Sequence, residues 1–85
     1  MSIKFDENYL QFSDFALCSA LVALGYKLES LDRTEPQRVI FVFKRSKRLD
    51  LTIHKFWQRK LLVEPLAFVE AQKYLKARIY GEGQS

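Results

Sequence analysis

The sequence has few of the residues from which covalent supports and phosphate-binding loops are built. Among 85 residues there are one cysteine and three glycines. A lone Cys18 cannot form a disulfide within the chain, which is typical of a reducing compartment, so we expect a cytoplasmic protein. Two of the three glycines lie near the end of the chain, which leaves no glycine-rich turn to hold a phosphate group.

Catalytic and metal-binding groups are equally sparse. A cysteine nucleophile needs a histidine beside it, and a zinc site needs four good ligands. Here Cys18 falls in an apolar stretch, where we interpret it as a core residue, and the only histidine, His54, is interpreted as a surface or edge residue. The acidic residues are dispersed, with no pair at a spacing that suggests acid–base chemistry. We therefore predict no enzymatic activity, no metal, no cofactor and no small-molecule substrate.

Long apolar runs are also missing. The longest uncharged run, "FALCSALVALGY" at residues 15–26, is well short of the roughly 20 residues that a membrane span needs. The start, "MSIKFDEN", has no apolar core of the kind found in signal peptides. With 48% hydrophobic residues, the chain can form a core of its own, so we expect one compact domain over residues 1–85 and no membrane contact.

The hydrophobic pattern predicts a small α+β domain. Strands are expected at 9–12, 26–33 and 38–45, with the last two forming a hairpin, and helices at 14–24, 46–60 and 65–80. A short edge strand is also predicted at 61–63. The order β-α-β-β-α-β-α matches a ferredoxin-like (split βαβ) arrangement with an added C-terminal helix. The alternative, if the strand at 61–63 does not form, is a three-stranded antiparallel sheet with three helices.

Polar residues at the expected helix ends agree with these limits. Ser13 or Asp14 and then Ser46 are suited to N-caps, and Gly25 to the end of the first helix. The first helix is apolar almost all round, which is typical of a helix buried on more than one side. The residues expected in the core include Leu21, Ile53, Phe56, Leu75 and Ile79, with Trp57 at the edge of the core.

Four segments resemble a known family: "FSDFALCSALVALGYKLESLDR", "RVIFVFKRS", "VEPLAFVEA" and "LKARIY". They are similar to a small bacterial and phage family of unknown function, over about residues 10–80. The resemblance implies a compact domain of phage or mobile-element character. It supplies no activity and no functional residues.

Positive charge is concentrated in one segment. Residues 38–60 contain eight basic residues and a single acidic one, Asp50. Drawn as a helix at about 100° per residue, Arg48, Lys55 and Arg59 share an arc of about 40°. No acidic residue interrupts this row, whereas ordinary exposed helix faces usually mix the two signs of charge. We predict a polyanion-binding surface, extended by residues before the helix: Lys44, Arg45 and Lys47. The alternatives are a solvated helix face and a docking surface for an acidic protein.

Two further sets of residues are candidates for contacts. Phe41 and Phe43 have the i, i+2 spacing with which RNA-recognition motifs stack bases on an open sheet face, although the glycines of that motif are missing. The alternative places both phenylalanines in the core. On the third helix, a group of residues projects together away from the buried stripe and forms a candidate partner surface: Val69, Lys73, Lys76 and Tyr80.

Together these patterns predict a non-catalytic accessory protein that binds nucleic acid, with RNA or single strands favoured over a duplex. The alternative is an adaptor or inhibitor of phage or mobile-element type, which binds another protein through the third or the first helix. An exposed apolar patch would favour this alternative, and an uninterrupted positive field would favour the first hypothesis.

Overall fold

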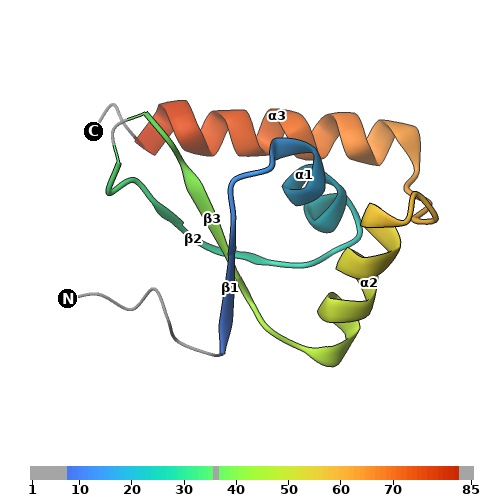
Figure 1. Ribbon diagram of the computed structural model, residues 1–85. Helices are drawn as coiled ribbons and strands as arrows, with labels where there is room; N and C mark the ends of the chain where they lie inside the picture. Colours follow the sequence, from blue (N-terminus) through green and yellow to red (C-terminus); the bar gives the residue numbers. More distant parts are fainter. Residues whose placement is uncertain (1–7, 36, 83–85) are drawn as a thin grey trace.

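The structure, a computed structural model, describes residues 8–35 and 37–82 (Figure 1). It is an α+β domain, as predicted, with three helices and a three-stranded antiparallel sheet. The elements follow one another in the order β1 (Tyr9–Phe12), α1 (Phe15–Ala23), β2 (Leu28–Asp32), β3 (Ile40–Lys44), α2 (Lys47–Trp57) and α3 (Pro65–Glu82).

The sheet has the strand order of a split βαβ unit. β3 lies in the centre and pairs antiparallel with β1 on one side and β2 on the other. Helix α1 carries the chain from β1 across to β2, and the predicted hairpin then places β3 between them. The register of β2 shifts between Leu28 and Ser30, which is a bulge in this outer strand.

The strand predicted at 61–63 does not form, so the sheet corresponds to the three-stranded alternative. The apolar side chains of Leu61 and Val63 suit a strand, but they line a hollow beside Ala20 of α1 instead. A strand needs a free sheet edge as a hydrogen-bonding partner. This segment runs from the end of α2 past α1 to the start of α3, and within the described residues it pairs with no strand (Figure 1).

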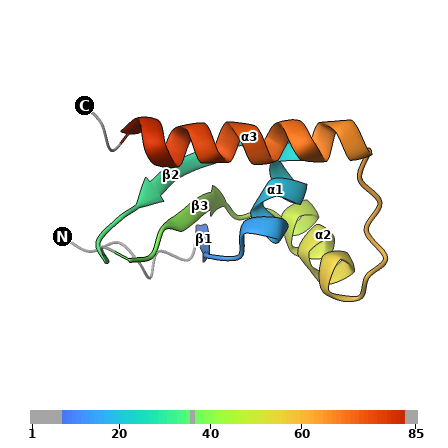
Figure 2. The same ribbon diagram turned by 90° about the horizontal axis from the view of Figure 1, so that it is seen from above.

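The core lies between one face of the sheet and the helices. Phe41 and Phe43 of β3 are buried there together with α1, which is buried from Leu17 to Leu21. α3 runs alongside α1, as the two views show (Figures 1 and 2). The remaining buried members of the core come from the other elements: Leu28, Leu49, Ala71 and Leu75.

Burial of the predicted core residues follows this arrangement. Leu21 and Leu75 have no exposed surface, as predicted. Ile53, Phe56 and Ile79 are partly buried and pack against the same core. The helix that was expected to be covered on several sides, α1, packs against α3, which runs alongside it (Figure 2), and its five consecutive residues 17–21 are all buried.

Side-chain caps fix where the helices begin. The carboxylate of Asp14 accepts a hydrogen bond from the Leu17 N–H at 2.9 Å, and the Ser46 hydroxyl accepts one from the Leu49 N–H at 3.0 Å. At α3, the Glu64 carboxylate accepts a hydrogen bond from the Ala67 N–H at 2.7 Å. Each cap satisfies a backbone donor that has no partner within the helix, so these polar residues position the three helices.

Candidate functional site

The basic residues before α2 lie at the end of β3 and in the turn that follows it. Lys44 is paired in register with Tyr9 of β1, and both side chains are on the sheet face opposite the core. Arg45 places its Nε 3.8 Å from an Asp50 carboxylate oxygen, and both side chains are about half exposed. An ion pair this long and this exposed is worth at most about 1 kcal/mol, so a phosphate can replace Asp50 at little cost.

Helix α2 continues this basic surface through Arg48 and Lys55, which are both exposed. The two residues are seven positions apart, which is about 10 Å along the helix. The Arg48 guanidinium lies 5.5 Å from the centre of the Tyr26 ring, so the ring supports it in a cation–π contact. The Tyr26 hydroxyl also forms a hydrogen bond with Thr52, at 2.8 Å, on the same side of α2.

Arg59 does not belong to this row, because α2 ends at Trp57, before the predicted limit of 60. The Arg59 N–H donates to the Phe56 carbonyl at 3.0 Å, and the Lys60 N–H donates to the Lys55 carbonyl at 2.9 Å. This pair of bonds is a Schellman motif, and Arg59 takes its left-handed position with a φ of 64°. The helical projection that aligned Arg59 with Arg48 and Lys55 is therefore wrong.

Phe41 and Phe43 cannot stack bases in this structure. Their exposed fractions are 2% and 1%, and both rings pack inside the core. The centre of the Phe43 ring is 6.3 Å from that of Phe12, and the centre of the Phe41 ring is 6.5 Å from that of Phe15. The alternative interpretation, in which both are core residues, is the correct one.

The candidate partner surface on α3 is exposed. Val69 is 42% exposed and Tyr80 67%, and the side chains of Lys73 and Lys76 are exposed as well. The ammonium group of Lys76 lies 6.0 Å from the centre of the Phe15 ring of α1. These four side chains are thus exposed on α3, and their contact with a partner stays a prediction.

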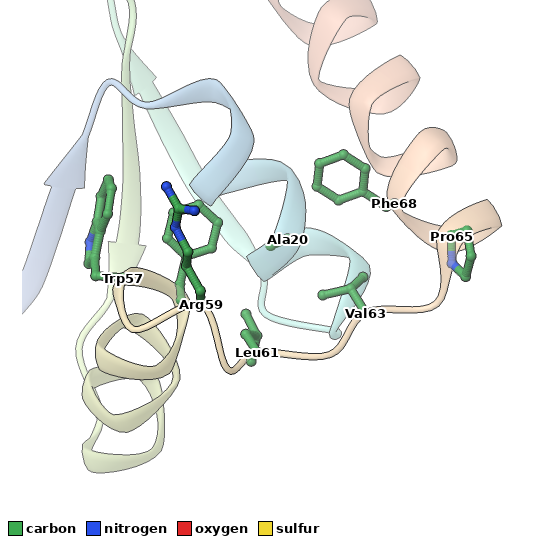
Figure 3. Close-up of a pocket in the computed structure, with 8 residues that line it drawn as sticks. Ala20, Trp57, Arg59, Leu61, Val63, Pro65 and Phe68 are labelled. Carbon is green, nitrogen blue, oxygen red and sulfur yellow. The ribbon is translucent and has the colours of Figure 1, made fainter.

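A hollow that the sequence did not reveal lies where α1, the end of α2 and the start of α3 meet (Figure 3). Its volume is about 650 Å³. It is lined by the following residues: Ala20, Phe56, Trp57, Arg59, Leu61, Val63, Pro65 and Phe68. The only visible signal was the apolar run at 61–63, which we interpreted as a strand.

Trp57 stands at one side of this hollow, next to Arg59 (Figure 3). Its ring makes an edge-to-face contact with Phe56, with ring centres 4.9 Å apart. Because 60% of Trp57 is exposed, its interpretation as a residue at the core edge is wrong. A large aromatic side chain is thus presented to solvent beside an arginine, and both residue types are enriched among the residues that dominate binding at protein interfaces.

A comparison with protein families places the chain among its relatives. The model of one family, described as a domain of unknown function (DUF5659), matches residues 7–81. The chain belongs to the DUF5659 family. No match was found among curated proteins or among solved structures. Membership in DUF5659 confirms the resemblance to a domain family of unknown function and assigns no activity.

The described part of this DUF5659 domain contains no group of three or more histidine, cysteine, aspartate or glutamate side chains arranged to hold a metal ion. Within the same ranges, no helix combines the length and the apolar character that crossing a membrane requires. His54 is exposed, whereas Cys18 is fully buried. Burial raises the pKa of the Cys18 thiol to about 12, with a smaller contribution from the Asp14 carboxylate, so the thiol is protonated at neutral pH and is a poor nucleophile.

Proposed function

We propose that this protein binds nucleic acid without performing catalysis, and that it holds the phosphates of RNA or of a single DNA strand. The binding surface consists of the end of β3, the turn after it and one side of α2. The observation that carries the proposal is the exposure of five cationic side chains along this path, with Asp50 as the only acid among them: Lys44, Arg45, Lys47, Arg48 and Lys55. A cluster of this kind attracts a polyanion and releases the counterions of its phosphates.

A single strand suits this surface better than a duplex. Reading a duplex requires a helix whose exposed side enters the major groove. On α2 that side is partly covered, since Tyr26 contacts Arg48 and bonds to Thr52. A flexible strand can follow the surface around Tyr26. The planar Arg48 guanidinium, held on the Tyr26 ring, also offers a platform on which an unpaired base can stack.

The cell compartment and the origin of the protein belong to the same proposal. A single unpaired cysteine fits work in the cytoplasm, where thiols stay reduced. A small domain that binds single strands also fits the phage or mobile-element character that the resemblance implied.

The salt dependence of binding tests this function. Affinity for a labelled single-stranded RNA, measured by fluorescence anisotropy, should fall linearly with the logarithm of the salt concentration. Three to five phosphate contacts predict a slope of about −2 to −4. The double substitution Arg48→Gln, Lys55→Gln should flatten the slope by about 1 to 1.5, because each lost contact stops releasing a counterion.

A matched control separates the effect of where the positive charges lie from the effect of the net charge. The pair Lys27→Gln, Arg38→Gln also removes one lysine and one arginine, at exposed positions outside the surface. It should leave the slope within about 0.3 of that of the original protein, since counterion release depends on contacts. The proposed function would be contradicted if both double substitutions weakened RNA binding equally. It would also be contradicted if the protein bound neither RNA nor single-stranded DNA at low salt.

A further inference from the structure

The hollow beside the end of α2 has the composition of a contact site for a protein segment. All of its lining residues are apolar except Arg59. Trp57, which lines the hollow, is 60% exposed, and two apolar residues next in sequence to lining residues are also open to solvent: Leu62 at 88% and Leu66 at 62%. Its volume, about 650 Å³, lies in the range of about 300–1,000 Å³ that is common for binding pockets. An exposed apolar concavity of this kind is typical of interaction sites.

The lining favours an apolar side chain over a nucleobase as the occupant. A base that enters a pocket must satisfy the donors and acceptors along its edge, and each one left unpaired costs about 1–3 kcal/mol. Arg59 is the only charged group in the lining, and the other side chains there offer a base almost no hydrogen-bonding partners. Leucine, isoleucine or phenylalanine side chains require none. The hollow therefore suits the apolar anchors of a polypeptide.

The charge around the hollow selects an acidic segment. Arg59 forms no ion pair with the residues that the structure describes. Lys60 follows it directly and is exposed. The nearest acid along the chain, Glu64, uses its carboxylate to cap α3 at the Ala67 N–H. A carboxylate from a partner can therefore approach Arg59 with no competing acid from the lining.

We propose that the hollow binds a short acidic, amphipathic segment of a partner protein. The apolar side chains of the segment pack against Trp57, Phe56 and Phe68, and one of its carboxylates pairs with the Arg59 guanidinium. This is the helix-in-groove mode of recognition, in which apolar anchors recur at i, i+3 or i+4, and i+7.

The segment does not compete with the nucleic-acid surface. Trp57 is nine residues after Arg48, which at about 100° per residue places the two on opposite sides of α2. The contact of Arg48 with Tyr26 and the position of Trp57 in the hollow agree with this separation. Both surfaces can be occupied at the same time, so the protein can connect a single strand to a partner protein.

A library of random displayed peptides, about 16 residues long, provides the probe. Selection on the original protein should enrich peptides that are rich in Asp and Glu and carry large apolar residues at helical spacing. Trp57 is the only tryptophan, so titration of a selected peptide should change the intrinsic fluorescence. Trp57→Ala should weaken binding by about tenfold or more, as loss of a central aromatic anchor does.

Charge reversal at Arg59 tests the acidic character of the partner. Arg59→Glu should lower the affinity for the selected peptides by about tenfold or more, and a new selection on this variant should enrich basic peptides. Two control variants should keep affinity within about twofold: Leu51→Ala, which removes a 65% exposed apolar side chain of α2 outside the hollow, and Lys27→Glu. Circular dichroism should show folded protein for all four variants, because the altered side chains are exposed.

Several results would overturn the inference. One is a selection that enriches no peptides, or peptides that are neutral or basic. Another is equal binding of the peptides to the Trp57→Ala and Leu51→Ala variants. A third is displacement of the peptides by a single-stranded RNA whose affinity also depends on Trp57, which would assign the hollow to nucleic acid. The Arg48→Gln, Lys55→Gln variant should still bind the peptides, so failure of the proposed function would be seen separately.

Discussion

The hydroxyl groups of Tyr26 and Thr52 lie 2.8 Å apart and join the connection after α1 to the middle of α2. The Thr52 hydroxyl donates its hydrogen to the Arg48 carbonyl, at 3.0 Å. Because a threonine hydroxyl has one hydrogen, Tyr26 must be the donor in the bond between the two side chains. The same tyrosine ring supports the Arg48 guanidinium. Tyr26 thus orients α2 and the basic side chain that it presents.

Removing this hydroxyl should weaken the fold without moving Arg48. Tyr26→Phe is expected to lower the free energy of unfolding by about 0.5–1.5 kcal/mol, the usual contribution of one hydrogen bond. Urea unfolding followed by circular dichroism measures the loss. RNA affinity should change little because the ring stays in place. A double-mutant cycle with Thr52→Ala should show that the two losses are not additive, and additive losses would contradict the bond.

Glycine at the left-handed position that ends α2, now occupied by Arg59, should increase the stability of the fold. Arg59 has a φ of 64°, a conformation that costs a non-glycine residue about 1 kcal/mol. Arg59→Gly should therefore raise the free energy of unfolding by about 0.5–1 kcal/mol, which would be seen as a rise in Tm. Arg59→Ala is the control, since alanine has the same backbone strain and should give no such gain.

The corresponding position at the end of α1 should respond in the opposite direction. Gly25 has a φ of 102°, and a Cβ atom placed there would meet nothing within 4 Å. Gly25→Ala should cost about 1 kcal/mol or more, and the cause would be backbone strain because there is space for the methyl group. A thermal melt of the variant measures this loss. An unchanged Tm would show that α1 can end without a left-handed residue.

The core should depend on Leu75 of α3. Its side chain is fully buried between α3 and the rest of the core. Leu75→Ala should lower the free energy of unfolding by about 2–4 kcal/mol, because it leaves a cavity. Leu66→Ala removes the same atoms from a residue that is 62% exposed and should cost less than about 0.5 kcal/mol. Denaturant unfolding of the two variants compares their free energies of unfolding. Similar losses for both would show that the face of α3 that carries Leu75 is not the buried one.

Cys18 should make stability fall at alkaline pH. Burial raises the pKa of its thiol from 9.0 to about 12 in the folded protein. The contribution of the protonated Cys18 thiol to the free energy of unfolding is fully present below pH 9. It is lost as the pH rises from 9 toward 12, because only the unfolded chain then releases the proton. The loss is up to about 1.4 kcal/mol per pH unit. The difference in stability between the original protein and Cys18→Ala should therefore narrow above pH 9, as measured by urea unfolding at several pH values.

Local signals in the sequence were sufficient to predict most of the fold. Ser46 and Asp14 marked helix starts, Gly25 marked a helix end, and the run of aromatic and β-branched residues at 40–43 marked the central strand. The apolar character of α1 also correctly indicated a helix with more than one covered side. These features depend on the backbone preferences and side chains of near neighbours, which a single sequence contains.

The features that were missed depend on contacts between distant segments. The end of α2 carries Arg59 where glycine is usual, so no residue marked the turn that removes it from the basic row. Leu61 and Val63 have the composition of a strand, and only the nearness of Ala20 and Phe68 explains why they line a hollow. Alternation showed that Phe41 and Phe43 share a face, but the packing of α1 and α3 decided that this face is buried.

The packing of α3 along α1 has a consequence for synthesis of the chain. α3 begins at Pro65 and α1 ends at Ala23, so about 40 residues separate the apolar helix from the element that covers it. A ribosome that adds about 5–20 residues per second needs roughly 2–8 s for this distance. Throughout that interval the nascent chain presents α1 without its cover. Chaperones that recognise apolar segments should therefore bind this protein during translation, and they should release it once α3 has left the exit tunnel.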